Sequence, residues 1–197
     1  MGRQPLARKK ILDAAKDIVM DRGSGALTFE ELVEESGVTR GGITYHFRTK
    51  QELLTALVAQ DLEQWEEIEA ALRPADLEPE TADLIAFLRS HTSRREDKRR
   101  LVAGMMTAFT HDPPVLDPIR EHERERLADI DWTDQALAVQ LLRFAAIGLF
   151  WSELFGCTEL PPKVRKRLVE KLESLARVWS DASHDVSATT GVDTRSK

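Results

Sequence analysis

The sequence of 197 residues has a single cysteine, Cys157, and no long apolar run. One cysteine cannot form an internal disulfide or a CxxC metal site, and it suits a reducing compartment. The longest apolar stretch, AAIGLFW, is far shorter than the ~20 residues that a membrane-spanning helix needs. No apolar run of the signal-peptide kind stands near the N-terminus. We therefore expect a soluble cytoplasmic protein without a membrane partner.

Patterns that carry enzymatic chemistry are also missing. Cys157 follows Gly156 with no histidine near it in the sequence, which indicates a small structural residue. The pair His111-Asp112 and the stretch EHERE at 121–125 contain metal-ligand residue types without the paired spacing of an HExxH site. The chain also lacks a glycine-rich phosphate loop. We expect no enzyme activity, no metal and no cofactor.

The net charge of −6 argues against a protein that binds nucleic acid over its whole surface, but the charge is unevenly spread along the chain. Residues 1–50 hold 9 Lys and Arg against 7 Asp and Glu, whereas the remaining residues hold 19 against 27. A mildly basic head on an acidic body indicates one local contact with an anionic partner.

Apolar residues recur with the helical period, and no alternating strand pattern or internal repeat is present. Thr28 with Glu31, and Thr49 with Glu52, are capping boxes that begin two helices. A first helix ends at Gly23, and short helices near 28–36 and 39–47 follow it. The later expected helices cover roughly 50–72, 80–96, 98–111, 115–129, 133–155 and 162–181. We predict an all-α fold of about nine helices.

The stretch GVTRGGITYHFRTK, residues 37–50, places two adjacent glycines in a short expected helix. Each glycine weakens a helix by about 1 kcal/mol relative to alanine. Together with the capped helix before it, this helix makes residues 28–47 the size of a helix-turn-helix. A helix weakened in this way indicates that its backbone has to approach a partner closely.

A helical projection of this segment separates a core face from an outward face. Ile43 and Phe47 fall together and should face a small core of Phe29, Leu32, Val33 and Val38. Gly41, Gly42 and Tyr45 should point outward. Such a thin outward face suits a recognition helix, whose N-terminal end enters the major groove of DNA. Helix N-termini at Thr28 and Thr39 favour phosphate, and Lys50 would add a phosphate anchor.

The segments ILDAA, ESGV, YHF and TKQELL follow one another within residues 11–58, with an Arg-Gly turn and the Thr28 cap between them. In this order they resemble the DNA-binding domain of the tetracycline-repressor (TetR) family of bacterial transcriptional regulators. The resemblance implies DNA contacts from Thr28, Thr39, Arg40, Gly42, Thr44, Tyr45, His46 and Lys50. Many members have an aromatic residue where Thr44 stands and a proline where Arg48 stands.

The second half of the chain resembles the family in architecture, which implies a helical domain that binds a small molecule and dimerises. The stretch 133–155 is apolar nearly all round, so we expect its own core on one side and a second chain on the other. The expected dimer interface consists of Phe144, Ile147, Trp151, Val164, Leu168, Leu172, Leu175 and Trp179. The alternative left open is that these residues are all core of a single chain.

Aromatic residues and methionines on the middle helices are candidates for a mostly apolar ligand pocket. The candidates are Trp65, Phe87, His91, Met105, Met106, Phe109, Phe144 and Trp151, with Thr107 and His111 as further polar groups. A stripe of this kind also fits ordinary core. The composition favours a lipophilic or aromatic effector over a sugar or nucleotide.

The sequence thus predicts a dimeric TetR-like regulator of transcription, a repressor that a small molecule releases from a palindromic operator in double-stranded DNA. We assign residues 1–50 to DNA binding, 51–182 to ligand binding and dimerisation, and 183–197 to a disordered tail. The alternatives are a helical protein-interaction module without DNA activity, and a constitutive or activating DNA binder.

Overall fold

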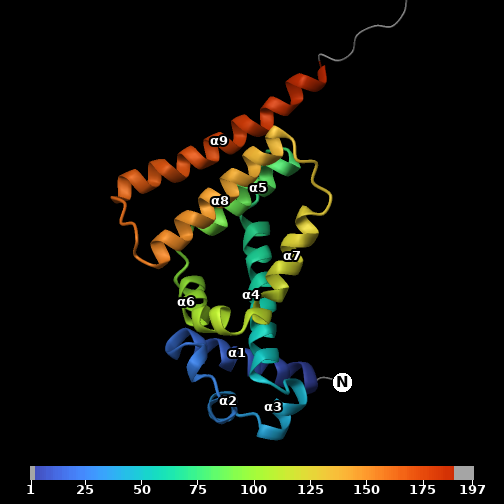
Figure 1. Cartoon of the computed structure of the whole chain (residues 1–197), viewed down its shortest axis with the longest axis vertical. Helices are drawn as coiled ribbons and strands as arrows, with labels where there is room; N and C mark the ends of the chain where they lie inside the picture. The colour runs from blue at the N-terminus through green and yellow to red at the C-terminus, as the bar shows by residue number, and fades with distance from the viewer. Residues whose placement is uncertain (1–2, 189–197) are drawn as a thin grey trace, which may run out of the picture. The chain divides into compact units, whose positions relative to one another are not determined.

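The structure is a computed structural model that describes residues 3–188, with side chains described for 6–179. Within this range the chain forms nine α-helices, two short 3-10 helices and no β-strand (Figure 1), so the predicted all-α class is confirmed. The helices are α1 (Arg3–Arg22), α2 (Phe29–Ser36), α3 (Arg40–His46), α4 (Lys50–Leu72), α5 (Pro79–Thr92), α6 (Glu96–His111), α7 (Asp117–Leu127), α8 (Asp134–Leu154) and α9 (Pro162–Ala188). The 3-10 helices are η1 (Ser24–Ala26) and η2 (Pro113–Leu116).

Helix boundaries agree with the sequence signals in most places. Helix α9 is longer than predicted, because it continues past residue 181 to Ala188. No proline or glycine interrupts the chain between Pro162 and Gly191, so nothing local ends the helix earlier. Residues 183–188 of the predicted tail are therefore helical, and 189–197 lie outside the described residues.

Two compact units divide the chain, and α4 begins in the first and ends in the second. The first unit comprises residues 1–65 and 94–129, and the second comprises residues 66–93 and 130–197. The two units are defined by contacts within the fold, and α6 and α7 belong to the same unit as the N-terminal helices. The division by role at residue 50 stays a prediction.

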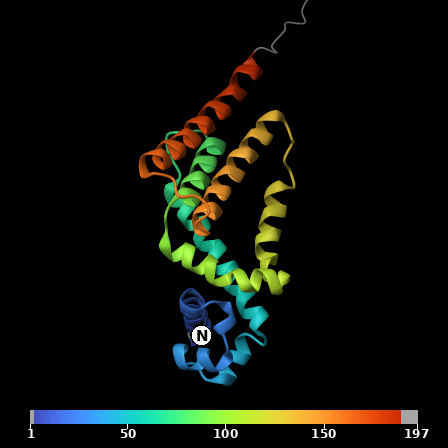
Figure 2. The ribbon, with the colours of Figure 1, turned by 60° about the vertical axis from the view of Figure 1, so that its left-hand side comes forward.

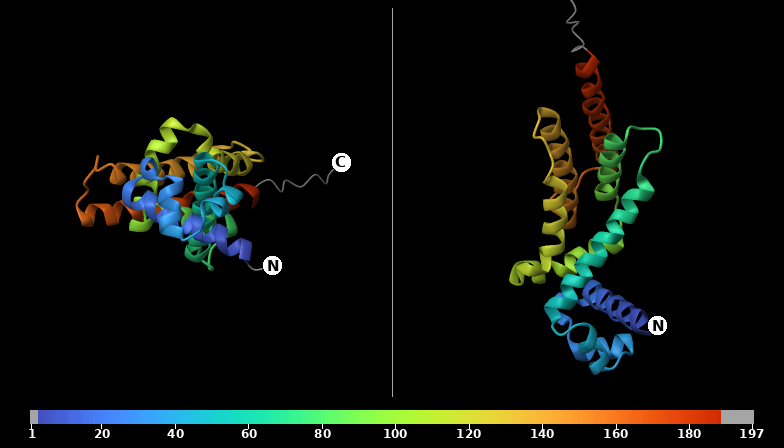
Figure 3. Two further views of the ribbon diagram at one scale, coloured as in Figure 1. Left: turned by 90° about the horizontal axis from the view of Figure 1, so that it is seen from below. Right: turned by 90° about the vertical axis from the view of Figure 1, so that its right-hand side faces the viewer.

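The first unit has one apolar core, to which five α-helices and η2 contribute. In Figure 2, α2 and α3 lie side by side next to α1. Helices α1 and α4 contribute most of the residues of this core, and α2, α3 and α6 add Leu32, Ile43 and Met105. Helix α6 lies against α1 (Figure 3). Their backbones approach so closely that a Cβ at Gly104 would collide with the carbonyl oxygen of Val19.

A buried lysine joins α6 to the first part of α4. Lys98 is 1% exposed, and its amino group donates to the Asp61 carboxylate and to Gln64 Oε1 at 3.4 Å. It also lies 5.4 Å from the centroid of the Trp65 ring. Burial lowers the pKa of Lys98, and the charge of Asp61 opposes that change. A buried charge needs such partners, so this cluster fixes the register of α6 on α4.

The second unit is a layer of α5, α8 and α9 around its own core (Figure 1). The buried residues of this core are Leu84, Ile85, Phe87, Leu88, Leu142, Ala146, Leu172 and Ala176. A half-buried ion pair joins two of these helices, since Arg89 on α5 donates to both oxygens of Glu173 on α9, at 3.1 and 2.9 Å. Helix α8 is long and apolar enough to cross a membrane by length and composition alone, a test that core helices of soluble proteins also pass.

Candidate nucleic-acid interface

A glycine turn and two threonine caps position α2 and α3. Thr28 begins α2, and its Oγ1 accepts a hydrogen bond from the N–H of Glu31 at 3.2 Å. Gly37 ends α2 with φ 65°, a left-handed conformation that favours glycine. Thr39 then begins α3, and its Oγ1 accepts from the N–H of Gly42 at 3.2 Å. The predicted helix-turn-helix is therefore formed by local signals.

The inward face of α3 agrees with the helical projection. Ile43 and Phe47 are both buried in the core of the first unit, next to Leu32. The half-buried side chains of Phe29, Val33 and Val38 pack against this core. Burial of Ile43 and Phe47 fixes the rotation of α3, and with it the residues that face outward.

The outward face of α3 carries one large side chain. Tyr45 is 70% exposed, and its ring meets the ring of His46 edge-on at 5.2 Å. Thr44 is exposed as well, and its hydroxyl donates to the carbonyl oxygen of Arg40 at 2.9 Å. Arg48 is exposed directly after the helix. An exposed aromatic side chain and an exposed hydroxyl suit contact with base edges and phosphates in a groove.

The two glycines of α3 play different parts, which corrects one expectation from the sequence. A Cβ at Gly41 would meet nothing within 4 Å, so this glycine does face open space. A Cβ at Gly42 would lie 2.9 Å from Val38 Cγ1 and 3.3 Å from Thr39 Oγ1. The expected outward orientation of Gly42 is wrong, because its Cβ would tilt toward the preceding turn, where Val38 stands four residues earlier. At the same spacing Gly41 has only Gly37, which has no side chain.

Two cations among the predicted DNA contacts already have partners within the first unit. Arg40 pairs with the Glu30 carboxylate on α2, and its guanidinium lies 5.8 Å from the centroid of the Phe29 ring. Lys50 is half-buried and directs its amino group to the carbonyl oxygen of Gly25 at 3.4 Å. Burial lowers the pKa of Lys50. Both side chains would have to exchange these partners to reach a phosphate.

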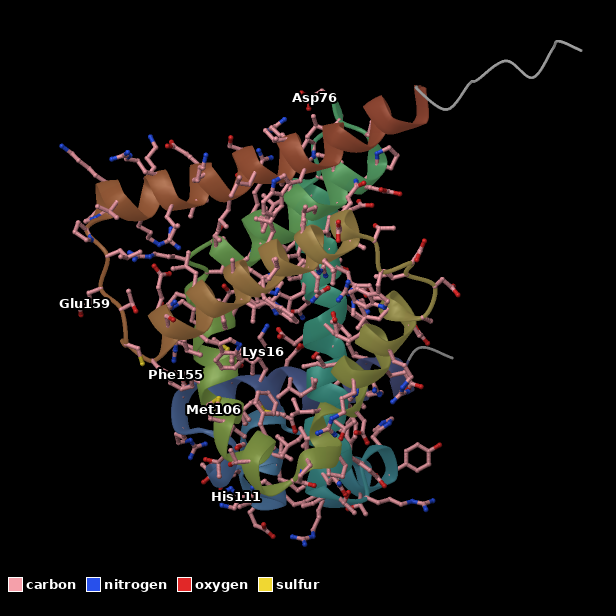
Figure 4. All side chains as sticks on the ribbon, turned by 45° about the horizontal axis from the view of Figure 1, so that its top comes forward. Lys16, Asp76, Met106, His111, Phe155 and Glu159 are labelled. Carbon is pink, nitrogen blue, oxygen red and sulfur yellow. The ribbon has the colours of Figure 1, made fainter. Side chains whose placement is uncertain are left out.

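The candidate pocket residues are divided between the two units. Trp65, Met105, Met106 and Phe109 belong to the first unit, where Met105 is buried in the core and Phe109 packs against it. His111 is exposed at the end of α6, and Figure 4 labels it there with Met106. The other candidates, which belong to the second unit, are Phe87, His91, Phe144 and Trp151.

Within the second unit, two of these candidates form a stacked group. The rings of Phe87 and His91 stack at 3.9 Å between centroids. The guanidinium of Arg143 lies 3.6 Å from the centroid of the Phe87 ring. Arg143 was not among the predicted pocket residues, because one arginine in an apolar helix has no distinctive spacing.

The exposed apolar residues of α8 lie on one side of that helix, opposite its buried residues. Leu137, Leu141, Phe144 and Phe155 follow spacings that keep them on one face, here called the α8 stripe. Leu141 is 63% and Phe144 is 60% exposed. Figure 4 labels Phe155 at the C-terminal end of α8, and Glu159 in the loop that follows. Trp151 lies next to the stripe and stacks on Phe155 at 5.6 Å between ring centroids.

Helix α9 has a corresponding α9 stripe, defined as Val164, Leu168 and Val178, which are exposed. Other residues of the predicted dimer interface are more buried than the stripe. Leu172 is buried in the core of the second unit. Ile147, Leu175 and Trp179 pack against that core. The predicted set therefore combined exposed residues with residues that pack on the chain's own core. It omitted Leu137, Leu141 and Phe155, which have the helical spacing of Phe144 on α8, and Val178 on α9.

Known proteins resemble both halves of the chain. Residues 11–57 match the family model "Bacterial regulatory proteins, tetR family", and residues 81–177 match "Tetracyclin repressor-like, C-terminal domain". The chain is 36% identical over 52 residues to the HTH-type transcriptional regulator SrpR of Pseudomonas putida, which covers 26% of this chain and 24% of SrpR. It is 29% identical over 118 residues to the uncharacterized HTH-type transcriptional regulator YfiR of Bacillus subtilis, covering 60% of this chain and 55% of YfiR.

Among solved structures, the multidrug binding protein EbrR complexed with ethidium has a similar fold. The TM-score is 0.61 at 24% identity, covering 84% of this chain and 97% of that one. The chain thus spans between about a quarter and about half the length of the two sequence relatives, and nearly all of the structural one.

Proposed function

This chain belongs to the TetR family, and on that premise we propose that it binds double-stranded operator DNA as a homodimer and regulates transcription. The observation that carries the DNA-binding part is the Thr39-capped helix α3. Its inward side is held by Ile43 and Phe47, and its outward side offers Tyr45 beside an unobstructed Gly41. A rigid support behind a thin polar face is what insertion into a major groove requires.

A mobility-shift titration at low salt tests DNA binding, with the DNA upstream of the protein's own gene as the probe. The unmodified protein should retard this probe. Tyr45→Ala should weaken binding by about 1–3 kcal/mol, the usual range for one lost base contact. Trp132→Ala is the matched control, since Trp132 is an exposed aromatic residue that belongs to neither helix of the helix-turn-helix. A protein that retards no probe would instead be a helical interaction module without DNA activity.

The second copy of this chain is the partner that the α8 and α9 stripes fit. Exposed Leu, Phe and Val side chains at helical spacing on two adjacent helices favour a helical partner of similar chemistry. Two-fold pairing of like stripes would bury both at once and would place two copies of α3 on one duplex. Light scattering at micromolar concentration should give twice the mass of one chain.

The proposed effector is a lipophilic or aromatic small molecule that releases the DNA. Support comes from the Phe87–His91 stack with Arg143, and from EbrR, a multidrug binding protein whose structure was solved in complex with the aromatic cation ethidium. An effector can release DNA only by binding better to the form that binds DNA poorly.

A compound panel screened by thermal shift tests this proposal, followed by DNA release measured for each compound that binds. Coupling of about 1–3 kcal/mol should appear, and DNA should weaken effector binding by the same factor. Tight binders that leave DNA affinity unchanged would favour a constitutive or activating regulator. A regulator of this kind acts in the cytoplasm of a bacterium, and we propose the same location for this protein.

A further inference from the structure

The two turns of α1 that precede the family match are strongly basic. The family model begins at residue 11, whereas α1 begins at Arg3. Residues 3–10, here called the basic segment, contain four Lys and Arg and no Asp or Glu. Residues 11–50 contain five Lys and Arg against seven Asp and Glu. The positive charge of residues 1–50 therefore comes entirely from the basic segment.

Packing places the basic segment beside the recognition helix. The guanidinium of Arg8 lies 5.4 Å from the centroid of the Phe47 ring, and Phe47 is the residue that ends α3. Helices α1 and α3 contact one another within the first unit (Figure 1). Exposed Arg48 follows Phe47 directly. The basic segment is thus fixed next to the C-terminal end of α3.

Two further cations of the segment are turned to solvent. Lys9 and Lys10 are exposed on the next positions of the helix after Arg8. Lys9 donates to Asp13 at 2.8 Å, but both side chains of this pair are largely exposed. Exposed pairs of this kind are weak in water, so a phosphate can replace the Asp13 carboxylate.

We propose that the basic segment is a second DNA-binding element, in which Lys9 and Lys10 neutralise backbone phosphates beside the groove that α3 enters. Arg8 positions the segment through its contact with Phe47. Contacts of this type add affinity that depends on salt and is independent of base sequence. The proposal rests on DNA binding by α3 and extends the bound surface beyond the range of the family model.

The test is the salt dependence of DNA binding by Lys9→Gln/Lys10→Gln. Two probes are used: a duplex that the unmodified protein selects from a random pool, and an unselected duplex of equal length. Each lost phosphate contact should reduce the slope of log affinity against log salt by about 0.9 per bound head. We expect a total reduction of about 2 to 4 for a dimer, with similar losses on both probes. Arg124→Gln/Lys163→Gln removes the same charge at exposed positions outside the segment and should leave the slope unchanged.

The outcomes separate this proposal from DNA binding itself. An unchanged slope for the double variant, with the unmodified protein still bound, would overturn the second element and leave α3 as the binding site. A loss confined to the selected duplex would also overturn it, because base readout would then explain the effect. An unmodified protein that binds neither probe would overturn DNA binding and the second element together. Equal melting temperatures for the variants and the unmodified protein exclude an effect of folding.

Discussion

Helices α3 and α8 each bury one face and leave the other exposed, but the exposed faces differ in chemistry. On α3 the outward residues are a glycine, a threonine and a tyrosine, with Arg48 beyond the helix end. On α8 they are leucines and phenylalanines. Protein–DNA interfaces are polar and contain ordered water, so a polar face suits contact with DNA. A face of Leu and Phe gains free energy only when a partner removes it from water.

The largest effect should come from charges placed in the α8 stripe. Leu141→Asp/Phe144→Asp should convert the dimer to monomers, since a dimer would then bury four unpaired carboxylates at a cost of several kcal/mol each. Dimerisation should weaken by about 1,000-fold or more. Light scattering gives the mass, and circular dichroism gives the helix content, which should be unchanged. Ile119→Asp is the control, because Ile119 is an exposed apolar residue on α7. A double variant that remains dimeric would remove the α8 stripe from the interface.

The next largest effect should separate the two sides of α9. Leu172 is 7% exposed in the core of the second unit, unlike Val178 of the α9 stripe. Leu172→Ala should lower the free energy of unfolding by about 2–5 kcal/mol through the cavity that it leaves. Val178→Ala should weaken dimerisation more than it lowers the stability of the single chain. Thermal melts at several protein concentrations distinguish the two, because only the dimer contribution depends on concentration. Equal behaviour of the two variants would contradict the division of α9 into two sides.

A smaller effect should distinguish the two glycines of α3. Gly41→Ala should stabilise the helix by up to about 1 kcal/mol, since the new methyl group meets open space. It should also weaken DNA binding by about tenfold, or ~1.4 kcal/mol, where the backbone of α3 approaches the duplex. Gly42→Ala should give less stabilisation, because its Cβ crowds Val38 and the Thr39 cap. Melting temperature and DNA affinity are measured for both. Unchanged DNA affinity in Gly41→Ala would mean that the backbone stays clear of the groove.

The smallest effect concerns the partner of Arg40. Glu30 forms an exposed ion pair with Arg40, and a hydrogen bond from its own backbone N–H together with the Arg40 guanidinium lowers the pKa of Glu30. Glu30→Gln should raise DNA affinity a few-fold, because Arg40 no longer has to leave a carboxylate to reach a phosphate. Glu34→Gln removes the same charge from the same helix and is the control. Identical gains in both variants would show a general charge effect and no special part for Glu30.

Sequence reasoning succeeded for α3 because its signals are local. The Thr28 and Thr39 caps, the Gly37 turn and the burial of Ile43 with Phe47 all depend on residues within one or two turns. It failed at Gly42, since a helical projection of α3 omits the side chains of Val38 and Thr39 just before the helix, toward which the Cβ of Gly42 would tilt. The basic segment was also overlooked, because Arg8 meets Phe47 only in the folded chain.

The dimer and pocket candidates show a different limit. The apolar band of α9 is wider than one contact needs, so its periodicity alone could not tell that Leu172 faces the chain's own core while Val178 faces outward. Likewise, Met105 and Phe87 both belong to the pattern of methionines and aromatic residues on the middle helices, yet they lie in different units. Contacts between residues far apart in the sequence decide which side of a helix is buried, and the periodicity of one sequence does not reveal those contacts.

We propose that α3 contacts DNA while the α8 and α9 stripes join two chains. Selection of bound duplexes from a random pool tests both parts in one measurement. We expect enrichment of an inverted repeat whose half-site centres lie one helical turn, ~34–36 Å, or a multiple apart. Enrichment of a single unrepeated motif, or no enrichment at all, would contradict the claim.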